Sequence, residues 1–336
     1  MTLENRIAGL IKLGAYLRTK DDALDEVIEN SSRANKWFTA ANQRTALDAI
    51  ATQMLEHTKL STFANAYSMP TEQKRIGLIP AGNIPLVGFH DWLCIFLAGH
   101  QAIIKSSEKD PYWLPFLTNK LVEFEPKSAS SFEFVDTLKG YDAVIATGSN
   151  NSSRYFETYF KHVPNIIRQN RNSVAILEGT ESTADLRLLA DDIFTYFGLG
   201  CRNVSKLYVP TGYNFEPLLE VFHEHKELIL HNKYQNNFDY NIVLYLLNKI
   251  PYQNNGCIIL TEGKAFSTRI ASLNYEYYDD KGQVELDLEA HQTELQCIVS
   301  NQPMTNLTTV PFGQSQRPEL QDFADGIDTM EFLTTL

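Results

Sequence analysis

The sequence predicts an α/β protein with two doubly wound domains, each built around a largely parallel sheet. Short apolar runs alternate with longer helical patterns from residue 75 onward, and this alternation is typical of parallel sheets covered by helices. The chain has 336 residues, which is more than one hydrophobic core usually requires. We therefore expect a first domain at 1–172, a second at 173–312, and a tail at 313–336 that packs on the first domain or on a second subunit.

Residues 1–70 form the helical N-terminal region of this prediction. Ile7, Leu10 and Leu17 lie roughly on one face of a helix, and Thr39 is a candidate N-cap for a later one. The region carries no pattern of catalytic residues, so we expect it to cover a sheet.

The first domain is expected to carry polar residues at one edge of its sheet. Its strands are predicted at 76–79, 102–104, 131–135 and 143–146, with helices at 86–97, 112–124 and 152–160. Asn83, Lys105 and the turn Gly148-Ser149 each follow a strand, and ligands of such sheets bind beyond the carboxyl ends of the strands. The Gly148-Ser149 turn also leads into a helix, whose first N–H groups suit an anion. A plain turn is the alternative interpretation.

The second domain begins with a strand that ends in a carboxylate. Strands are predicted at 173–177, 206–209, 256–260 and 296–299, helices at 184–196, 215–225 and 240–247, and a polar loop at 232–237. Glu178 follows the first strand and precedes Gly179. Such a carboxylate can act as a base or simply be solvated, and its position leaves both interpretations open.

A short glycine-rich stretch at 197–203 joins a helix to a strand in this domain. It reads Phe-Gly-Leu-Gly-Cys-Arg-Asn, and Gly198 and Gly200 allow a tight turn. Cys201 could present its thiol there, the adjacent Arg202 would favour the thiolate, and backbone amides could hold an oxyanion. Taken alone, a small buried cysteine is the commoner interpretation.

Composition excludes several classes of function. The net charge of −12 argues against nucleic acid or an anionic membrane as the main partner. The N-terminus lacks a signal-peptide pattern and no apolar run has the length of a membrane span, so we expect a cytoplasmic protein with reduced thiols. His223 and His225 would face different sides of a helix, and no metal site is predicted. The remaining cysteines lie in apolar patterns typical of a core: Cys94, Cys257 and Cys297.

One segment of the first domain resembles a known cofactor-binding strand. Residues 96–108 read Phe-Leu-Ala-Gly-His-Gln-Ala-Ile-Ile-Lys-Ser-Ser-Glu, which is similar to A-L-A-A-G-N-T-V-V-L-K-P-S-E of the aldehyde dehydrogenase superfamily. More closely, the chain resembles the LuxC-type fatty acyl-CoA reductases of bacterial luminescence. The resemblance covers nearly the whole chain, most clearly 76–332, and implies that Lys105 and Glu108 bind the adenosine ribose.

Two further segments of the first domain extend the resemblance. Asn83-Ile84-Pro85 resembles the N-F-P segment that supplies an oxyanion-hole amide, and this assigns that role to Asn83. Thr147-Gly148-Ser149 resembles the T-G-S turn at the pyrophosphate. The first domain is thereby implied to bind a dinucleotide through Gly148 and Ser149.

Three segments of the second domain carry the implied chemistry. Gly200-Cys201 resembles the G-Q-x-C turn of the nucleophile, and Leu177-Glu178-Gly179 resembles L-E-L-G-G, whose Glu is the base of hydrolytic members. Residues 293–296, Thr-Glu-Leu-Gln, resemble E-I-F-G-P, which places Glu294 on the nicotinamide ribose. Three departures fit the acyl-CoA reductase branch better than the hydrolytic branch: the short spacing between Glu178 and Cys201, the absence of the second Gly of L-E-L-G-G, and the absence of the usual Gln before Cys201.

The resemblance implies an aldehyde-dehydrogenase-like fold and reduction of an acyl thioester, as acyl-CoA or acyl-protein, to an aldehyde through an acyl-Cys201 intermediate. It implies NADPH as cofactor, but NADH stays open because Glu108 would repel a 2′-phosphate. Glu178 is interpreted as a proton shuttle or positioning group. An acyl-protein synthetase and a second copy of the chain, paired through 330–336, are the implied protein partners. The alternatives are an aldehyde-oxidising dehydrogenase and a catalytically silent nucleotide-binding scaffold.

Overall fold

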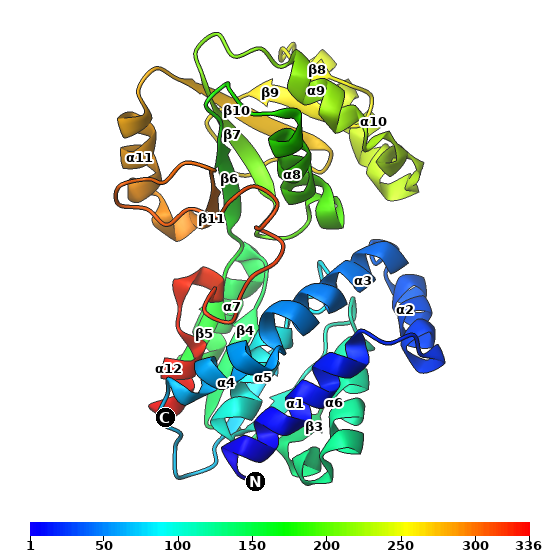
Figure 1. The fold of residues 1–336 in the computed structure, drawn as a ribbon, viewed down its shortest axis with the longest axis vertical. Coiled ribbons are helices and arrows are strands. Elements are labelled where there is room, and N and C mark those ends of the chain that lie inside the picture. The colour runs from blue at the N-terminus through cyan, green and yellow to red at the C-terminus, as the bar shows by residue number, and fades with distance from the viewer. The chain divides into compact units, whose positions relative to one another are not determined.

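The protein is an α/β chain with two largely parallel sheets, as predicted. The computed structural model describes residues 1–336, apart from the side chain of Asn150. The chain divides into a first unit, residues 1–170 with 317–336, and a second unit, residues 171–316. The sequence-based prediction placed domain boundaries after residues 172 and 312. Each unit is described by itself (Figure 1).

The first unit contains a five-stranded parallel sheet in the order β3-β2-β1-β4-β5. Its strands are β1 (Arg75–Ile79), β2 (Gln101–Ile104), β3 (Phe132–Phe134), β4 (Ala143–Thr147) and β5 (Asn165–Arg168). The chain leaves β1 toward β2 on one side and later returns to β4 on the other side. This reversal makes the β1–β4 border the switch point at which ligands of doubly wound sheets bind. The sequence did not predict β5, which is four residues long and directly follows Pro164.

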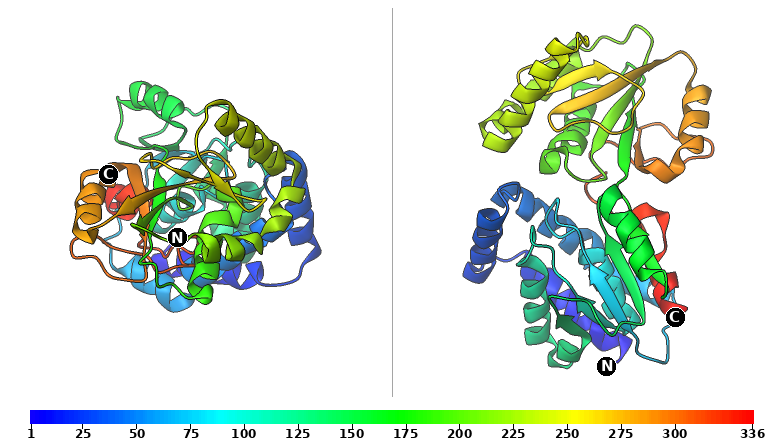
Figure 2. Two further views of the ribbon diagram at one scale, coloured as in Figure 1. Left: turned by 90° about the horizontal axis from the view of Figure 1, so that it is seen from above. Right: turned by 180° about the vertical axis from the view of Figure 1, so that it is seen from behind.

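Helices cover both faces of this sheet. They are α1 (Leu3–Leu17), α2 (Asp22–Ala34), α3 (Ala40–Ala49), α4 (His57–Asn65), α5 (Phe89–Ala98), α6 (Trp113–Phe124) and α7 (Asn150–Phe160), with short turns η1 (Ile50–Met54) and η2 (Pro126–Ser131). Figure 2 shows α7 alone on the face opposite to α1 and α6. From β1 to β3 the chain moves across the sheet in one direction, whereas α7 connects β4 to β5 in the other direction. Right-handed connections therefore place α7 on the opposite face. Thr39 is confirmed as an N-cap: its hydroxyl accepts the Asn42 N–H.

The C-terminal tail belongs to the first unit. It contains η6 (Ala324–Gly326) and α12 (Thr329–Thr334), and α12 packs on α5. Met330 and Leu333 are fully buried, and the Leu333 carbonyl oxygen lies 2.8 Å from His100 Nε2. Residues 329–334 therefore form a helix whose buried residues pack within the first unit, and the pairing of 330–336 with a second copy stays a prediction.

Arg168 fastens this tail to the end of β5. Its Nη2 lies 2.7 Å from Asp91 Oδ1 and donates to Thr329 Oγ1 at 2.8 Å, while Nη1 donates to the Ala324 carbonyl. Arg168 and Asp91 are 2% and 5% exposed. A buried pair of this kind needs both partners, because either charge alone would be costly to bury.

The second unit contains a six-stranded sheet in the order β11-β6-β7-β10-β9-β8. Its strands are β6 (Asn172–Ile176), β7 (Val204–Pro210), β8 (Gln253–Asn254), β9 (Ile259–Glu262), β10 (Ser272–Tyr278) and β11 (Leu295–Val299). All pairings are parallel except that of β8 with β9. The sequence did not predict β8 or β10.

Helices pack on both faces of this second sheet as well. They are α8 (Thr183–Phe194), α9 (Glu216–His223), α10 (Asn232–Leu247) and α11 (Lys281–Ala290), with turns η3 (Thr195–Gly198), η4 (Lys226–Leu230) and η5 (Gln292–Glu294). Helices α8 and α9 share one apolar core and α11 another. The loop predicted at 232–237 is helical. Tyr234, Phe238 and Asn241 are buried at helical spacing, so packing outweighs the polar composition of this segment.

Candidate active site

The residues predicted in the first unit follow β1, β2 and β4 at the carboxyl edge of one sheet. Asn83 lies after β1, Lys105 and Glu108 after β2, and Gly148-Ser149 after β4. The side chains of Asn83, Lys105, Glu108 and Ser149 are exposed. The parallel pairing of β1 with both β2 and β4 therefore brings the loops of all five residues to the same edge.

The loops after β1 and β2 are fastened together beneath these exposed groups. Asp110 Oδ2 accepts the Leu86 N–H at 3.0 Å, and Asn35 Nδ2 donates to the Lys109 carbonyl at 3.2 Å. Asp110 is buried, and among the described residues its Oδ1 has no hydrogen-bond partner. Burial raises the pKa of Asp110 to about 6. The loop that carries Asn83 is thus held by a buried carboxylate whose charged form is disfavoured by desolvation.

The turn after β4 fits the pyrophosphate of a dinucleotide. A Cβ added to Gly148 would lie 2.7 Å from Ser152 Cβ and 3.0 Å from Phe156 Cε2, so only glycine allows this turn to approach α7 so closely. The Ser149 hydroxyl accepts the Ser152 N–H at 3.4 Å and caps the helix. The N-terminus of a helix at the switch point favours an anion. These residues therefore fit the predicted cofactor.

Cys201 in the second unit follows a strained turn and precedes β7. Tyr196, Phe197 and Gly198 have φ values of 56°, 59° and 72°, all in the left-handed region. Tyr196 and Phe197 are buried, and the ring of Phe197 lies 4.5 Å from that of His231. Packing thus holds two non-glycine residues in an unfavourable conformation, which proteins tolerate mainly at functional sites.

Asn203 holds this turn from within, and the sequence analysis gave it no role. Its Oδ1 accepts the Gly200 N–H at 2.8 Å, and its Nδ2 donates to the Thr195 carbonyl at 2.8 Å. Its own N–H donates to the Gly200 carbonyl at 3.1 Å. Because that carbonyl shares a peptide plane with the Cys201 N–H, Asn203 fixes the direction of the candidate oxyanion donor. An Asn directly after a glycine-rich turn is the sequence pattern that could have indicated it.

Cys201 itself is partly exposed, and its neighbours connect it to two strands. Its carbonyl accepts a hydrogen bond from Ser173 Oγ on β6 at 2.9 Å. The adjacent Arg202 places Nη1 3.2 Å from the Sγ of Cys297 on β11. Cys297 is buried, as predicted, together with Cys94 and Cys257. The Arg202 guanidinium, which was predicted to favour the Cys201 thiolate, therefore contacts the sulfur of Cys297.

Glu294 lies at the same edge of the second sheet as Cys201. It directly precedes β11, and its side chain is exposed. Arg171, directly before β6, donates from Nη1 to the carbonyls of Gln292 and Leu295 at 3.2 and 3.0 Å. The segment that carries Glu294 is therefore anchored to the start of β6. Since β11, β6 and β7 are parallel neighbours, their amino ends carry both predicted groups.

Glu178 lies at the opposite edge, which corrects the prediction that it acts with Cys201. It follows the carboxyl end of β6 and forms an ion pair with Lys281. Ser173, which touches the Cys201 turn, lies five residues earlier on the same strand, so about 16 Å of strand separates the two positions. The L-E-G motif gave no indication of the sheet edge at which its carboxylate would lie.

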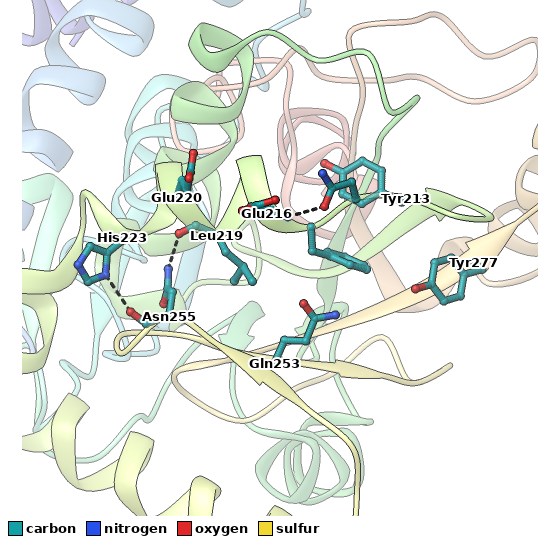
Figure 3. A pocket seen from close by; sticks show the side chains of 10 residues that line it. Tyr213, Glu216, Leu219, Glu220, His223, Gln253, Asn255 and Tyr277 are labelled. Atoms are coloured by element: carbon teal, nitrogen blue, oxygen red, sulfur yellow. Dashed lines mark hydrogen bonds between the residues drawn. The ribbon is translucent and has the colours of Figure 1, made fainter.

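A shallow cavity of about 700 Å³ also lies at this opposite edge of the second sheet. Figure 3 shows its aromatic residues, Tyr213 and Tyr277, with Glu216 and Glu220 on α9. None of the predicted site residues lines it. Its carboxylates would repel the phosphates of a nucleotide or coenzyme.

The fold is that of the aldehyde dehydrogenases. Aldehyde dehydrogenase 21 from Physcomitrella patens, solved with succinate, aligns over 100% of this chain and 84% of its own, with a TM-score of 0.71 and 11% identity. Indole-3-acetaldehyde dehydrogenase AldA from P. syringae, in complex with NAD+ and IAA, aligns over 89% and 72%, with a TM-score of 0.65 and 14% identity. An aldehyde dehydrogenase from Bacillus cereus, solved with NAD+, covers the same shares at 0.61 and 12%.

Within this fold, residues 64–219 match the model of the acyl-CoA reductase (LuxC) family. The predicted resemblance to LuxC-type reductases of the aldehyde dehydrogenase superfamily is thereby confirmed. No curated protein matches the sequence. The family match on this fold supports an oxidoreductase of aldehyde chemistry.

The described residues contain neither a candidate membrane-spanning helix nor a candidate metal cluster. None of their helices combines the length and the apolar character needed to cross a bilayer. Likewise, no cluster of His, Cys, Asp and Glu among them is arranged to bind a metal ion.

Proposed function

We propose that the protein reduces an acyl thioester to an aldehyde through an acyl intermediate on Cys201. The observation that carries this proposal is the nucleophile turn, because two buried side chains, Asn203 and Ser173, fix the backbone on either side of a partly exposed cysteine. The family match over residues 64–219, which include this turn, supports a thioester as substrate.

In the first step, the Cys201 thiolate attacks the thioester carbonyl and the coenzyme or carrier thiol leaves. The Cys201 N–H, directed by the Asn203–Gly200 hydrogen bond, is a suitable donor to the oxyanion. The resemblance assigns a second donor to the Asn83 amide. One such donor contributes about 3 kcal/mol to stabilising a transition state of this type.

The cofactor is proposed to bind at the carboxyl edge of the first sheet. Gly148 and Ser149 suit the pyrophosphate, and Lys105 and Glu108 the adenosine ribose, while Glu294 is assigned to the nicotinamide ribose. The bound nicotinamide supplies the hydride that converts the acyl group into an aldehyde. NADPH is the proposed form, with NADH as the alternative because of the Glu108 carboxylate.

The position of Glu178 favours reduction over the aldehyde-oxidising alternative. A dehydrogenase that produces an acid needs a base to activate water at the acyl-enzyme. The carboxylate that resembles the base of hydrolytic members, Glu178, lies at the far edge of the sheet, with Lys281 as its partner. An acyl-enzyme without this base is better protected from hydrolysis.

The test is the intact mass of the protein after incubation with a long-chain acyl-CoA and no cofactor. We expect one acyl adduct on the wild type and none on Cys201→Ala. Cys257→Ala is the matched control, because it removes a buried thiol and should still form the adduct. NADPH and NADH are then compared by which one releases the adduct as aldehyde.

The alternatives give different results in the same assay. An adduct that hydrolyses rapidly to the acid, together with NAD(P)-dependent oxidation of aldehydes, would favour the dehydrogenase. Absence of an adduct from every thioester and aldehyde, with cofactor binding intact, would favour the silent scaffold.

A further inference from the structure

Two irregularities in the second sheet meet at Ser173. Between β6 and β7, Ser173 pairs with Val204 but Val174 pairs with Lys206, so β7 carries one extra residue. Between β11 and β6, Leu295 pairs with Asn172 but Cys297 pairs with Ser173, so β11 also carries one extra residue. Bulges re-aim nearby groups and are frequent beside active sites. Here they flank one residue on both sides.

The Ser173 hydroxyl bridges the two bulged strands. Ser173 is fully buried. Its Oγ accepts the Cys297 N–H at 3.1 Å and donates to the Cys201 carbonyl at 2.9 Å. A serine hydroxyl has only one hydrogen to donate, so that hydrogen is committed to the nucleophile residue.

We propose that Ser173 is a positioning residue that couples the Cys201 turn to β11. This inference rests on the proposed function and deepens it. The Cys201 carbonyl belongs to the peptide plane that follows the nucleophile, whereas Asn203 fixes the plane that precedes it. With both planes held, the direction of the Cys201 side chain and N–H is set relative to the sheet.

The coupling also reaches the residue assigned to the nicotinamide ribose. Cys297 lies three residues after Glu294, and its N–H is the group that Ser173 accepts. Arg202 adds a second link from the turn to Cys297 through its guanidinium. Ser173 therefore fixes the position of Cys201 relative to β11, which begins directly after Glu294. It touches neither substrate nor cofactor and acts only through these neighbours.

The experiment compares acylation with alkylation of Cys201. Acylation, by a long-chain acyl-CoA or by 4-nitrophenyl acetate, needs the directed N–H as well as the thiolate. Alkylation by iodoacetamide needs the thiolate without an oxyanion donor. We expect Ser173→Ala to slow acylation by about tenfold and to change alkylation less than about twofold, since the variant loses orientation rather than the nucleophile.

Two controls separate positioning from folding. Ser205→Ala removes a hydroxyl from the same bulge, where Ser205 Oγ donates to the Phe266 carbonyl at 2.6 Å and lies 3.2 Å from the Ser173 carbonyl oxygen, and it should acylate at nearly the wild-type rate. Ser173→Thr and Ser173→Val introduce side chains of equal size, but threonine keeps the hydroxyl and valine lacks it. Threonine should therefore acylate faster than valine even if the alanine variant does not fold.

The outcomes distinguish this inference from the proposed function. If 4-nitrophenyl acetate shows the dependence on Ser173 but no acyl-CoA reacts with the wild type, the positioning role stands and the thioester substrate is wrong. Equal acylation by the threonine and valine variants would overturn the positioning role. So would a parallel fall of acylation and alkylation in Ser173→Ala, which indicates general loosening of the unit.

Discussion

The two sheets have the same kind of architecture but carry their candidate functional groups at opposite edges. In the first unit, Asn83, Lys105 and Ser149 follow the strands. In the second unit, Cys201 and Glu294 precede β7 and β11. The first arrangement uses loops that lead out of strands and a helix N-terminus, which suit phosphates. The second uses the entry into strands, where a strained turn and two bulges aim single groups.

In doubly wound sheets, ligands usually bind beyond the carboxyl ends of the strands. The candidate groups follow this rule in the first unit and depart from it in the second. Glu178 follows its strand, as the rule favours, and it lies away from the nucleophile. The amino edge has three consecutive left-handed residues, 196–198, held by packing, which suits a residue that must react.

Two substitutions test whether the reaction takes place at the amino edge of the second sheet and not at its carboxyl edge. Cys201→Ala at the amino edge should lower aldehyde formation by about 1,000-fold or more, because it removes the nucleophile. Glu178→Gln at the carboxyl edge should change it less than about threefold. Steady-state rates with acyl-CoA and NADPH measure both. A large loss in Glu178→Gln would return that carboxylate to the mechanism.

One ion pair of the first unit is buried and one of the second unit is exposed, and we expect their contributions to stability to differ accordingly. Arg168→Met in the first unit leaves Asp91 buried without its cation, and we expect a loss of about 3–5 kcal/mol in the free energy of unfolding. Arg187→Ala in the second unit breaks an exposed pair with Glu224 and should change the free energy of unfolding much less, because exposed ion pairs contribute little. Denaturant titrations of the two variants give both values, and equal losses would contradict the assigned burial.

Two buried carboxylates with similar pKa values should respond differently to amidation. Burial raises the pKa of Asp110 and of Asp192 to about 6, but Asp192 accepts hydrogen bonds from the Gly313 and Ser315 N–H groups. The stabilisation from a raised pKa is present below about pH 4 and lost as pH rises through about 6. Relative to Asp110→Asn, the wild type should therefore lose up to about 3 kcal/mol over that range.

Asp192→Asn should show a further penalty at every pH, because an amide cannot replace both carboxylate oxygens as acceptors. Urea unfolding at pH values from 4 to 7 measures these differences. A pH-independent difference between the wild type and Asp110→Asn would contradict the raised pKa.

The smallest effect is expected at the cofactor edge of the first unit. Ser149→Ala removes the N-cap of α7 and should weaken NADPH binding by about fivefold, equivalent to about 1 kcal/mol. Thr39→Ala removes the N-cap of α3 in the same unit and should lower stability to a similar extent without affecting NADPH. Fluorescence titration with NADPH distinguishes the two, and equal weakening would argue against a role for the turn after β4.

Much of the fold could be predicted because its pattern is local. The strands at 76–79, 102–104, 143–146 and 173–177 are short buried runs between turns, and the structure has strands at all of them. β5 and β10 were missed. β10 contains Asn274, Glu276 and several tyrosines, so it lacks the apolar run that predicts a buried strand. It forms because it pairs with β7 and β9, and this pairing cannot be read from the local sequence.

The candidate site could be predicted residue by residue but not in its arrangement. Cys201 and Asn83 became candidates because of their neighbours in the sequence. Ser173 and Asn203 were missed because their roles depend on hydrogen bonds to carbonyls and amides brought close only by folding. The same limit explains the error for Glu178, since strand register decides at which edge a carboxylate lies.

The return of residues 317–336 to the first unit has a consequence for biosynthesis. The second unit is one uninterrupted stretch, so all of its residues leave the ribosome before the first unit has received its last helix. Until then Arg168 lacks Thr329 and Ala324, and the surface that α12 covers is open to water. The half of the chain made first is thus completed last, and nascent chains pass through a stage in which chaperones can bind that apolar surface.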